Sequence, residues 1–592
     1  ESDLDAALHQ LELQQREVGG DSYPYGLQII LTALNSATHR GDPISLLDLD
    51  PVLEKLQREI KDPNFIKALA KNLLLDNKHR VRLTLKPNED MAALKVAAEA
   101  ARLAEMKAGL SEEESQAIID QSKALQARQV QVDDDTILPK VGLEDIPERM
   151  HYVHGTNADN EDKKLTRYGA GTNGLIYQQV IIKLPELPEA LHGLLPIYSA
   201  CLTELGAGNK DYLETQRWQA GVVGSIGAYS SIRGAVDDVQ CIDAYFTLSA
   251  KALTRNQAAM TELMQATLEN VRFDEHQRIR ELIAQMRARR EQSVTGNGHS
   301  LALSAASACM SPAAKLSHKL SGLEGIQAIK ALDAALQDDT ALAAFADQLT
   351  EIHRAILAAP RQFLLVGEED RLNDYTTQLN QQWTNTARKQ SPGFSLAPVT
   401  GKVKEAWFTS TQVNFCARAY PSVASDHPDA AALTVLGGFL RNGYLHRAIR
   451  EQGGAYGAGA SQDSNIASFR FYSYRDPRLS ETLADFDQSL VWLQENDHDW
   501  SQIEEAILGV VSAIDKPSSP AGEAKQTFHA ELFGRTQETR ERFRNRVLQV
   551  KLDDLKRVAH TYLTPENENT AVVCNATASE EVASLGLATI TL

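Results

Sequence analysis

The stretch SDHPDAAALTVLGGFLRNGYLHRAIREQGGAYGAGA, Ser425–Ala460, contains a helix, a shorter helix and a glycine-rich strand in close succession. Apolar residues recur at spacings of three and four, which predicts one helix over 428–441 with a single apolar face. We expect Asp426 to cap this helix and Pro428 to lie in its first turn. Asn442-Gly443 is expected to interrupt it. The residues of the apolar face are Ala432, Leu433, Leu436, Phe439 and Leu440.

The second half of the stretch brings a cation and a phenol close together. A short helix over 444–451 is expected to end at Gly453-Gly454, and a strand over 454–460 follows. Glycine weakens a strand unless another backbone or a ligand must come close. Arg450, at the helix end, and Tyr456, on the thin strand, are therefore expected to face one shared space. The alternative is a surface arginine paired with Glu451 or Asp429 and a tyrosine packed in the core.

Length and composition indicate a multidomain globular protein. The 592 residues are 43% hydrophobic and 23% charged, which suggests about four domains. The net charge of −19 argues against a nucleic-acid partner. No apolar run reaches the length that a membrane-spanning helix needs, so no membrane partner is expected. The chain starts without methionine and in a helical pattern, and we expect it to be a fragment.

The five cysteines are scattered and form neither a disulfide framework nor a zinc ribbon, so buried thiols are expected. Their spacing favours a reducing compartment, with the cytoplasm slightly preferred. These residues are Cys201, Cys241, Cys309, Cys416 and Cys574.

The chain divides into four predicted segments. Residues 1–87 are helices followed by an alternating strand over 80–85, which is typical of the tail of an α+β domain. Residues 88–149 form two long helices with a capping box at Ser111 and Glu114, and therefore predict a helical hairpin linker. Its acidic run, residues 133–135, and two prolines precede the next domain.

Residues 150–395 and 396–592 form an internal repeat. Each unit has a strand, a helix, a short helix, a glycine-containing strand, a second strand, several helices and a short apolar strand. The fold class is therefore predicted to be α+β, with helices layered on one face of mainly antiparallel sheets. The paired strands of unit one are 175–184, 222–229, 241–248 and 363–366; those of unit two are 412–420, 454–460, 465–472 and 571–574.

The sequence contains no complete catalytic motif. There is no H-E-x-x-H, H-x-x-E-H, G-x-S-x-G or Walker loop. Arg272–His276 resembles an inverted zinc motif with arginine in place of the first histidine, at a junction between helices. His151 and His154 have zinc-like spacing without a third ligand, and 169–174 spells G-x-G-x-x-G but leads into a strand. Each is interpreted as coincidence, and no metal ligand is assigned to this chain.

Three segments nevertheless resemble the pitrilysin/insulinase superfamily of zinc metallopeptidases, and within it the presequence-protease branch. They are LLLDNKHRVRLTLKP (73–87), GTNGLIY (171–177) and RNGYLHRAIREQGGAYGAGA (441–460). The resemblance implies the rear of a second domain, a hairpin, and third and fourth domains of a two-halved enzyme that encloses a chamber. The family's zinc site lies in a first domain that is not expected in this chain.

The resemblance also implies a function. The substrates would be unfolded peptides, and zinc-bound water, supplied with a glutamate by the N-terminal half of the same chain, would attack the peptide bond. The family's arginine and tyrosine, which reach the substrate near the zinc, fall on Arg450 and Tyr456 as catalytic residues. The chain alone is expected to be inactive. The alternatives are a non-catalytic peptide-binding or structural subunit of the superfamily, or a helical scaffold that binds partners through sheet edges.

Overall fold

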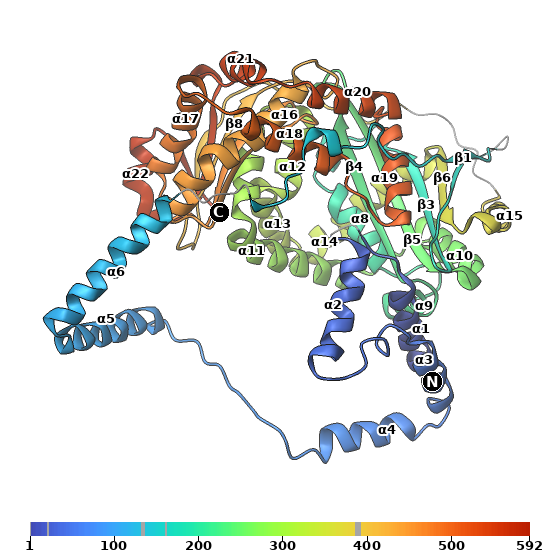
Figure 1. Cartoon of the computed structure of the whole chain (residues 1–592). Helices are drawn as coiled ribbons and strands as arrows, with labels where there is room; N and C mark the ends of the chain where they lie inside the picture. Colours follow the sequence, from blue (N-terminus) through green and yellow to red (C-terminus); the bar gives the residue numbers. More distant parts are fainter. Residues whose placement is uncertain (1, 21–22, 132–136, 160–162, 385–391) are drawn as a thin grey trace. The chain divides into compact units, whose positions relative to one another are not determined.

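The computed structural model describes residues 2–20, 23–131, 137–159, 163–384 and 392–592, and the acidic run at 133–135 lies outside them (Figure 1). The chain forms two compact units. One comprises residues 1–61 and 146–592, and the other comprises residues 62–145. The larger unit contains both repeats.

The first repeat is built on a six-stranded mixed sheet with the order β1-β2-β6-β3-β5-β4. β2 and β6 pair in parallel, and every other pair in this sheet is antiparallel. The strands are β1 (Thr156–Asn157), β2 (Lys164–Gly169), β3 (Leu175–Lys183), β4 (Ser225–Gly234), β5 (Ile242–Leu253) and β6 (Arg361–Gly367). The helices are α7 (Glu189–His192), α8 (Leu195–Glu204), α9 (Tyr212–Val222), α10 (Gln257–Glu269), α11 (His276–Ala306), α12 (Pro312–Ser321), α13 (Leu323–Ala335), α14 (Asp339–Ala358) and α15 (Leu372–Gln382).

The second repeat has a six-stranded sheet with the order β12-β7-β11-β8-β10-β9. Its strands are β7 (Lys404–Phe408), β8 (Phe415–Pro421), β9 (Gly457–Asp463), β10 (Ser468–Tyr474), β11 (Asn569–Cys574) and β12 (Ala588–Thr591). Its helices are α16 (Ala430–Leu440), the π-helix η6 (Arg441–Gln452), α17 (Ser480–Glu495), α18 (Trp500–Ile514), α19 (Pro520–Leu532), α20 (Gln537–Leu548), α21 (Leu552–Tyr562) and α22 (Ser579–Ser584).

The two sheets confirm the internal repeat strand by strand. β2, β6, β3, β5 and β4 of the first correspond in order to β7, β11, β8, β10 and β9 of the second. In each sheet one pair of these equivalent strands is parallel, β2 with β6 in the first and β7 with β11 in the second. The fold is therefore α+β, as predicted, although β2 and β7 were not anticipated.

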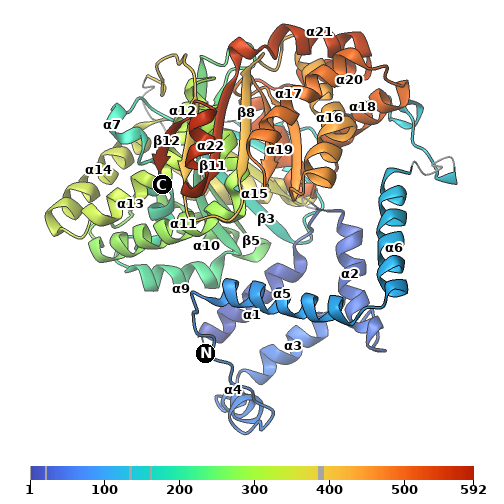
Figure 2. The same cartoon turned by 90° about the vertical axis from the view of Figure 1, so that its left-hand side faces the viewer.

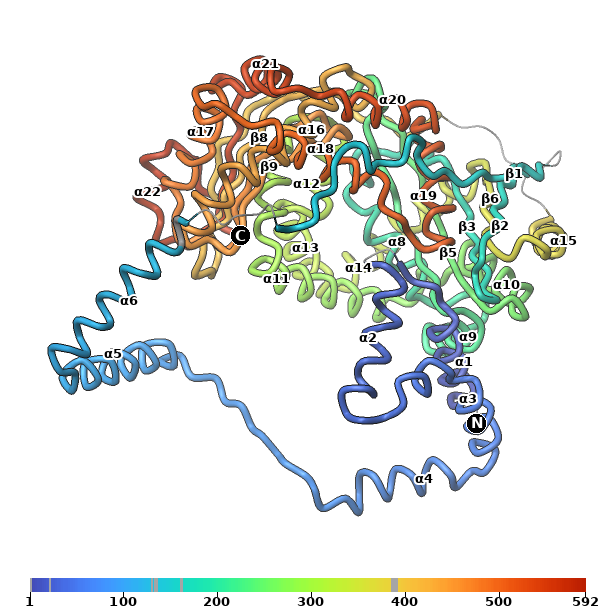
Figure 3. Tube along the Cα trace, viewed as in Figure 1, coloured from blue at the N-terminus to red at the C-terminus, as the bar shows by residue number. Residues whose placement is uncertain are grey.

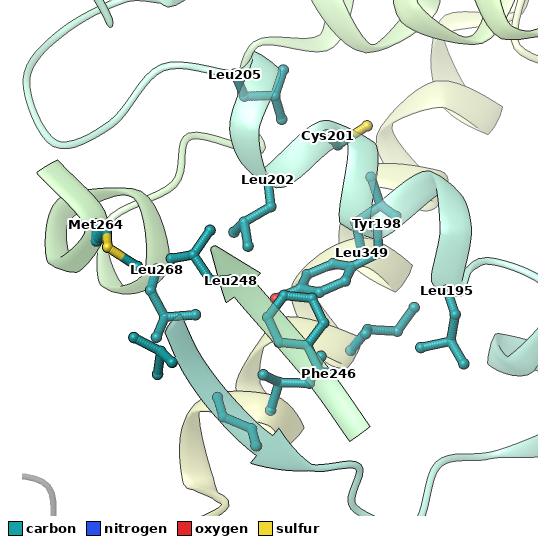
Figure 4. Packing of buried hydrophobic residues seen from close by; sticks show 14 of the residues in the cluster. Leu195, Tyr198, Cys201, Leu202, Leu205, Phe246, Leu248, Met264, Leu268 and Leu349 are labelled. Atoms are coloured by element: carbon teal, nitrogen blue, oxygen red, sulfur yellow. The ribbon is translucent and has the colours of Figure 1, made fainter. Parts of the chain in front are cut away.

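Helices cover both faces of each sheet, where the sequence predicted one. One face of the first sheet packs on its own helices; Figure 4 shows Tyr198 and Leu202 of α8 against Phe246 and Leu248 of β5. The opposite face packs on α19 from the second repeat and on Leu13 of α1. The second sheet in turn receives α11 and α13 from the first repeat (Figure 2). Each repeat thus completes the core of the other.

The N-terminal helices α1 (Ser2–Arg16), α2 (Tyr25–Thr38) and α3 (Asp50–Glu59) belong to the larger unit. Glu12 of α1 accepts hydrogen bonds of 2.9 and 2.5 Å from Arg255, and Lys251 donates to Glu17 at 2.5 Å. Gln10 donates to the carbonyl oxygens of residues 220 and 223. These contacts fix α1 on the first repeat.

The smaller unit contains α4 (Phe65–Ala70), η1 (Lys71–Leu75), α5 (Met91–Gly109) and α6 (Glu112–Val130). An extended stretch joins η1 to α5 (Figure 3). The predicted strand over 80–85 is wrong: this stretch pairs with no described residue, and Leu85 is 87% exposed. The alternating apolar residues of this stretch have no neighbouring strand among the described residues with which they could form a sheet. The predicted capping box of Ser111 and Glu114 is confirmed, but no residue of α5 is buried.

Candidate functional site

Arg450 lies on a helix that continues directly from α16. The predicted break at Asn442-Gly443 is wrong, because α16 passes into η6 without leaving the helical region. Gly443 instead allows close packing, since a Cβ there would lie 2.4 Å from the ring of Trp492. Leu445 and Ile449 anchor η6 in the core, so Arg450, the next residue, faces outward.

The helix cap is also different from the prediction. α16 begins at Ala430 with Asp429 as its N-cap residue. Asp426 does not cap it, because its carboxylate accepts a hydrogen bond of 2.7 Å from Arg542 of α20. The side chain therefore ties two helices of the second repeat together.

A glycine turn carries the chain from η6 into β9. Gly454 has a φ of +82°, a conformation that favours glycine, and its N–H donates to the carbonyl of Arg450 at 3.1 Å. Ala455 N–H then donates to the carbonyl of Ile449 at 3.1 Å. The turn at Gly453-Gly454 was predicted correctly, and it returns Tyr456 to the end of the helix that carries Arg450.

The structure brings Arg450 and Tyr456 together. The Arg450 guanidinium carbon lies 5.9 Å from the centre of the Tyr456 ring, within the range of a cation–π contact. The Tyr456 ring contacts the Tyr474 ring edge-on, with ring centres 5.5 Å apart. The backbone N–H of Tyr456 donates to the carbonyl of Tyr474 at 3.1 Å. Tyr456 is 67% exposed, so its hydroxyl is open to a ligand.

The alternative of an ion-paired arginine and a buried tyrosine does not hold. Glu451 pairs with His446 at 3.4 Å, and Asp429 pairs with Arg557 at 2.7 Å. Within the described ranges, no carboxylate lies within ion-pair distance of Arg450. The guanidinium makes a polar contact of 3.5 Å, between Nη1 of Arg450 and Nε2 of His446. The guanidinium can therefore bind an external carbonyl or carboxylate without first breaking an ion pair.

Tyr456 lines a groove of about 590 Å³, and Arg450, which is not among the lining residues, lies over the Tyr456 ring. The other lining residues come from η6 (Arg441, Asn442 and His446), α11 (His299), β10 (Tyr472 and Tyr474) and the start of β9 (Gly457 and Ala458). Of these lining residues, only Tyr456 was predicted from the sequence as a site residue. The position of His446, one turn before Arg450 on the same helix, was the available signal for that residue.

His299 reaches the groove because α11 is kinked. Asn297 leaves the helical region, and Gly298 lies so close to Phe415 that a Cβ would approach the ring to 2.4 Å. His299 then stacks edge-on against Tyr474, with ring centres 4.7 Å apart. Burial lowers the pKa of His299, and its Nδ1 is buried without a hydrogen-bond partner among the described residues. This neutral ring suits contact with apolar or aromatic ligand groups.

The motifs that were interpreted as coincidence have structural roles. Arg272 pairs with Asp274 at 2.9 Å, and Glu275 accepts hydrogen bonds from the N–H groups of residues 206 and 212. In the G-x-G-x-x-G stretch, the N–H groups of Thr172 and Gly174 donate to the carboxylate of Glu368. A side-chain carboxylate thus takes the place where a phosphate would bind.

Metal ligands are not gathered in the part of the chain that the structure describes. No group of three or more histidine, cysteine, aspartate or glutamate side chains there could hold a metal ion. The zinc implied by the resemblance therefore finds no fitting site among these residues. All five cysteines are free thiols; Cys201, Cys416 and Cys574 are buried as expected, whereas Cys241 is exposed and Cys309 is half-buried.

Two parts of the chain match known protein families. Residues 85–332 match a family described as associated with the C subgroup of the M16 peptidases, and residues 404–579 match the "PreP C-terminal domain". The chain belongs to the M16 peptidase family, the pitrilysin/insulinase superfamily expected from its sequence motifs.

Within that family the chain is similar to presequence proteases. It is 28% identical to the mitochondrial presequence protease of Yarrowia lipolytica over 95% of this chain and 56% of that protein. It is 26% identical to presequence protease 1, chloroplastic/mitochondrial, of Arabidopsis thaliana over 96% of this chain and 53% of that protein. The chain thus spans about half the length of the curated relatives it matches.

Solved structures support the fold. An M16 inactive domain from Pseudomonas fluorescens has 16% identity and a TM-score of 0.52, covering 72% of this chain and 98% of that one. Pitrilysin has 12% identity and a TM-score of 0.50, covering 76% of this chain and 46% of that one.

The compartment expected from the cysteines gains no support. The relatives carry mitochondrial or chloroplastic names, so the preference for the cytoplasm is not upheld. Among the described residues, no helix combines the length and the apolar character that crossing a membrane requires.

Proposed function

We propose that this chain forms the substrate-holding side of a peptidase that degrades unfolded peptides. Arg450 and Tyr456 would hold and polarise a peptide carbonyl at the mouth of the groove. The observation that carries the proposal is the pair itself: a guanidinium without a carboxylate partner among the described residues and an exposed phenol, 5.9 Å apart beside a groove. Similarity to presequence proteases supports it.

The chemistry follows from the two donors. A guanidinium offers a planar pair of N–H groups, and a phenol offers a neutral O–H. Each donor that is aimed at a developing oxyanion contributes about 3 kcal/mol to transition-state stabilisation. The metal and its ligands would be contributed by a segment equivalent to the N-terminal half of the relatives. The residues described here would bind and orient the peptide.

The partners in this proposal are unfolded peptides and the N-terminal half of the same protein. The two halves would close around the peptide in a chamber, with the helices α5 and α6 as the connecting arm. A chamber of limited volume would exclude folded proteins. The 592-residue chain on its own would bind peptides and cleave none.

Turnover tests the roles of the two residues. The chain would be joined to the zinc-domain half of a presequence protease, and cleavage of an unfolded peptide would be measured. Arg450→Ala and Tyr456→Phe should each lower kcat/KM by about tenfold or more and leave the zinc content unchanged. Normal turnover in both variants would refute the assignment.

The chain offers a matched control. Arg371 lies over the ring of Tyr375 at 5.5 Å in the first repeat, an arrangement like that of Arg450 over Tyr456. Arg371→Ala removes the same side chain away from the groove and should leave kcat/KM unchanged. If the joined protein binds peptide but does not cleave it, the alternative of a non-catalytic peptide-binding subunit is favoured.

A further inference from the structure

The strand β9 has one side without a partner strand, because it lies at the end of its sheet. Ser422 N–H donates to the carbonyl of Ala467 at 2.7 Å, so odd-numbered residues of β10 bond to β8 and even-numbered ones bond to β9. The register pairs Gly457 with Tyr474 and Gly459 with Tyr472. Those two glycines therefore face β10, and the N–H and C=O of Ala458 face outward.

The outward groups of Ala458 have no hydrogen-bond partner among the described residues, and Ala458 is one of the residues that line the groove. Beyond it, α16 closes on the strand, since a Cβ on Gly437 would lie 2.9 Å from the carbonyl oxygen of Ala460. The edge left without a partner is thus a short one centred on Ala458, which is only 8% exposed and is reached through the groove.

The other sheet edges are protected in ordinary ways. β1 and β12 are short, which limits pairing with another chain. β4 corresponds to β9 in the first repeat, and α8 and α12 lie against it. α16 and η6 likewise lie against β9, but at Ala458 the strand borders the groove, its flanking residues are glycines, and it carries no lysine or proline.

We propose that the outward edge of β9 at Ala458 binds the main chain of an extended peptide, which adds one residue pair to the second sheet. The inference rests on the proposed function, since the peptide is the substrate that Arg450 and Tyr456 would hold. Two hydrogen bonds form: Ala458 N–H donates to a peptide carbonyl, and the same peptide residue donates its N–H to the Ala458 carbonyl.

The pairing predicts which residues of the groove each peptide side chain meets. The side chain of the peptide residue opposite Ala458 lies on the same face as that of Ala458 and meets Arg441 and His446. The residues on either side of it point to the opposite face and meet His299, Tyr472 and Tyr474. The favoured segment therefore has an acidic residue between two aromatic ones.

The probe is a fluorescein-labelled peptide, Gly-Ser-Gly-Tyr-Asp-Tyr-Gly-Ser-Gly, and its binding to the 592-residue chain is followed by fluorescence anisotropy. N-methylation of its aspartate removes the N–H that would reach the Ala458 carbonyl. This change should weaken binding about fivefold or more. Methylation of the N-terminal glycine, outside the pairing, should leave binding unchanged.

Ala458→Pro tests the protein side of the pairing. Proline removes only an outward N–H here, a position that edge strands tolerate, and binding should weaken about fivefold or more. Ala228→Pro is the matched control, because Ala228 also follows a glycine and its N–H also faces away from the partner strand of β4. It should bind the probe like the parent chain.

The outcomes are distinct. Loss of affinity in the N-methylated peptide supports the pairing even if Ala458→Pro fails to fold. If N-methylation has no effect while Arg450→Ala still weakens binding, the edge pairing is overturned and the proposed function stands. No binding of the unmodified probe at about 1 mM, the level of a very weak complex, also overturns it. Self-association through β9 that excludes the probe would do the same.

Discussion

Gly437 and Gly438 are neighbours in α16 but face different surroundings, so alanine should have opposite effects at the two positions. A Cβ on Gly437 would lie 2.9 Å from the Ala460 carbonyl oxygen and 3.0 Å from the Ser461 Cα, both backbone atoms of β9. A Cβ on Gly438 would have Ala506 as its nearest neighbour at 3.9 Å, an ordinary contact. The two substitutions are otherwise the same chemical change in the same helix.

The magnitudes follow from two effects. Alanine stabilises a helix interior by about 1 kcal/mol over glycine, and this gain applies to both positions. At Gly437 the strand must also move away by about half an ångström, and overpacking of this kind costs about 1–3 kcal/mol. We expect Gly438→Ala to stabilise by about 0.5–1 kcal/mol and Gly437→Ala to destabilise by up to about 2 kcal/mol.

Thermal unfolding by circular dichroism would measure the difference. The Tm of Gly438→Ala should exceed that of Gly437→Ala by about 1–3 °C, because a unit of this size has a large entropy of unfolding. Because β9 carries Ala458 and follows Tyr456, Gly437→Ala should also weaken peptide binding while Gly438→Ala leaves it unchanged. Equal Tm values in the two variants would refute the reasoning, because they would show that β9 yields to the added methyl without cost.

Three further predictions concern other parts of the chain. Burial lowers the pKa of His529 to about 4, so as the pH falls the histidine is protonated in the unfolded chain before it is protonated in the folded one. The free energy of unfolding is therefore highest above pH 6.5 and decreases as the pH falls towards 4. His529→Gln should reduce the loss between pH 7 and 5 by about 1–2 kcal/mol, measured by urea unfolding, and an unchanged pH profile would count against this prediction. Arg544 donates to Asp515 at 2.6 and 2.9 Å, and to the carbonyl of Pro147 at 2.8 Å. Arg544→Ala should cost about 3–5 kcal/mol in the same assay, and a urea midpoint like that of the parent chain would contradict it. Trypsin should cut first at Arg80 and Arg82, where the backbone is exposed and outside any sheet; a first cut within either repeat, seen by mass spectrometry, would contradict the description of this segment.

The order of elements was enough to predict the repeat, because apolar runs and glycine turns follow one another in the same order in both repeats. The strands β2 and β7 were missed because each is short and begins with lysine, and only Leu165 and Tyr168 of β2 face the core. The strand predicted over 80–85 shows the converse: alternation predicts a strand only where a neighbouring strand exists. Periodicity describes one segment, whereas a sheet requires two.

The candidate site was half predictable for the same reason. Arg450 and Tyr456 are close in sequence, and the glycine turn between them made their meeting foreseeable. His299 comes from a kinked helix of the first repeat, and its approach to Tyr474 depends on packing between the repeats. The continuation of α16 into a π-helix was missed because Gly443 was taken as a breaker, while its role is to admit Trp492.

The parallel pairing inside each sheet has a consequence for synthesis of the protein. Lys164 pairs with Gln362, and Glu405 pairs with Ala588, so each sheet is completed by residues that leave the ribosome late within their repeat. At typical translation speeds the first partner waits roughly 10–40 s for the second. During that interval β2 and β7 each present an open edge. Each of these strands therefore stays without its parallel partner until most of its repeat has been synthesised.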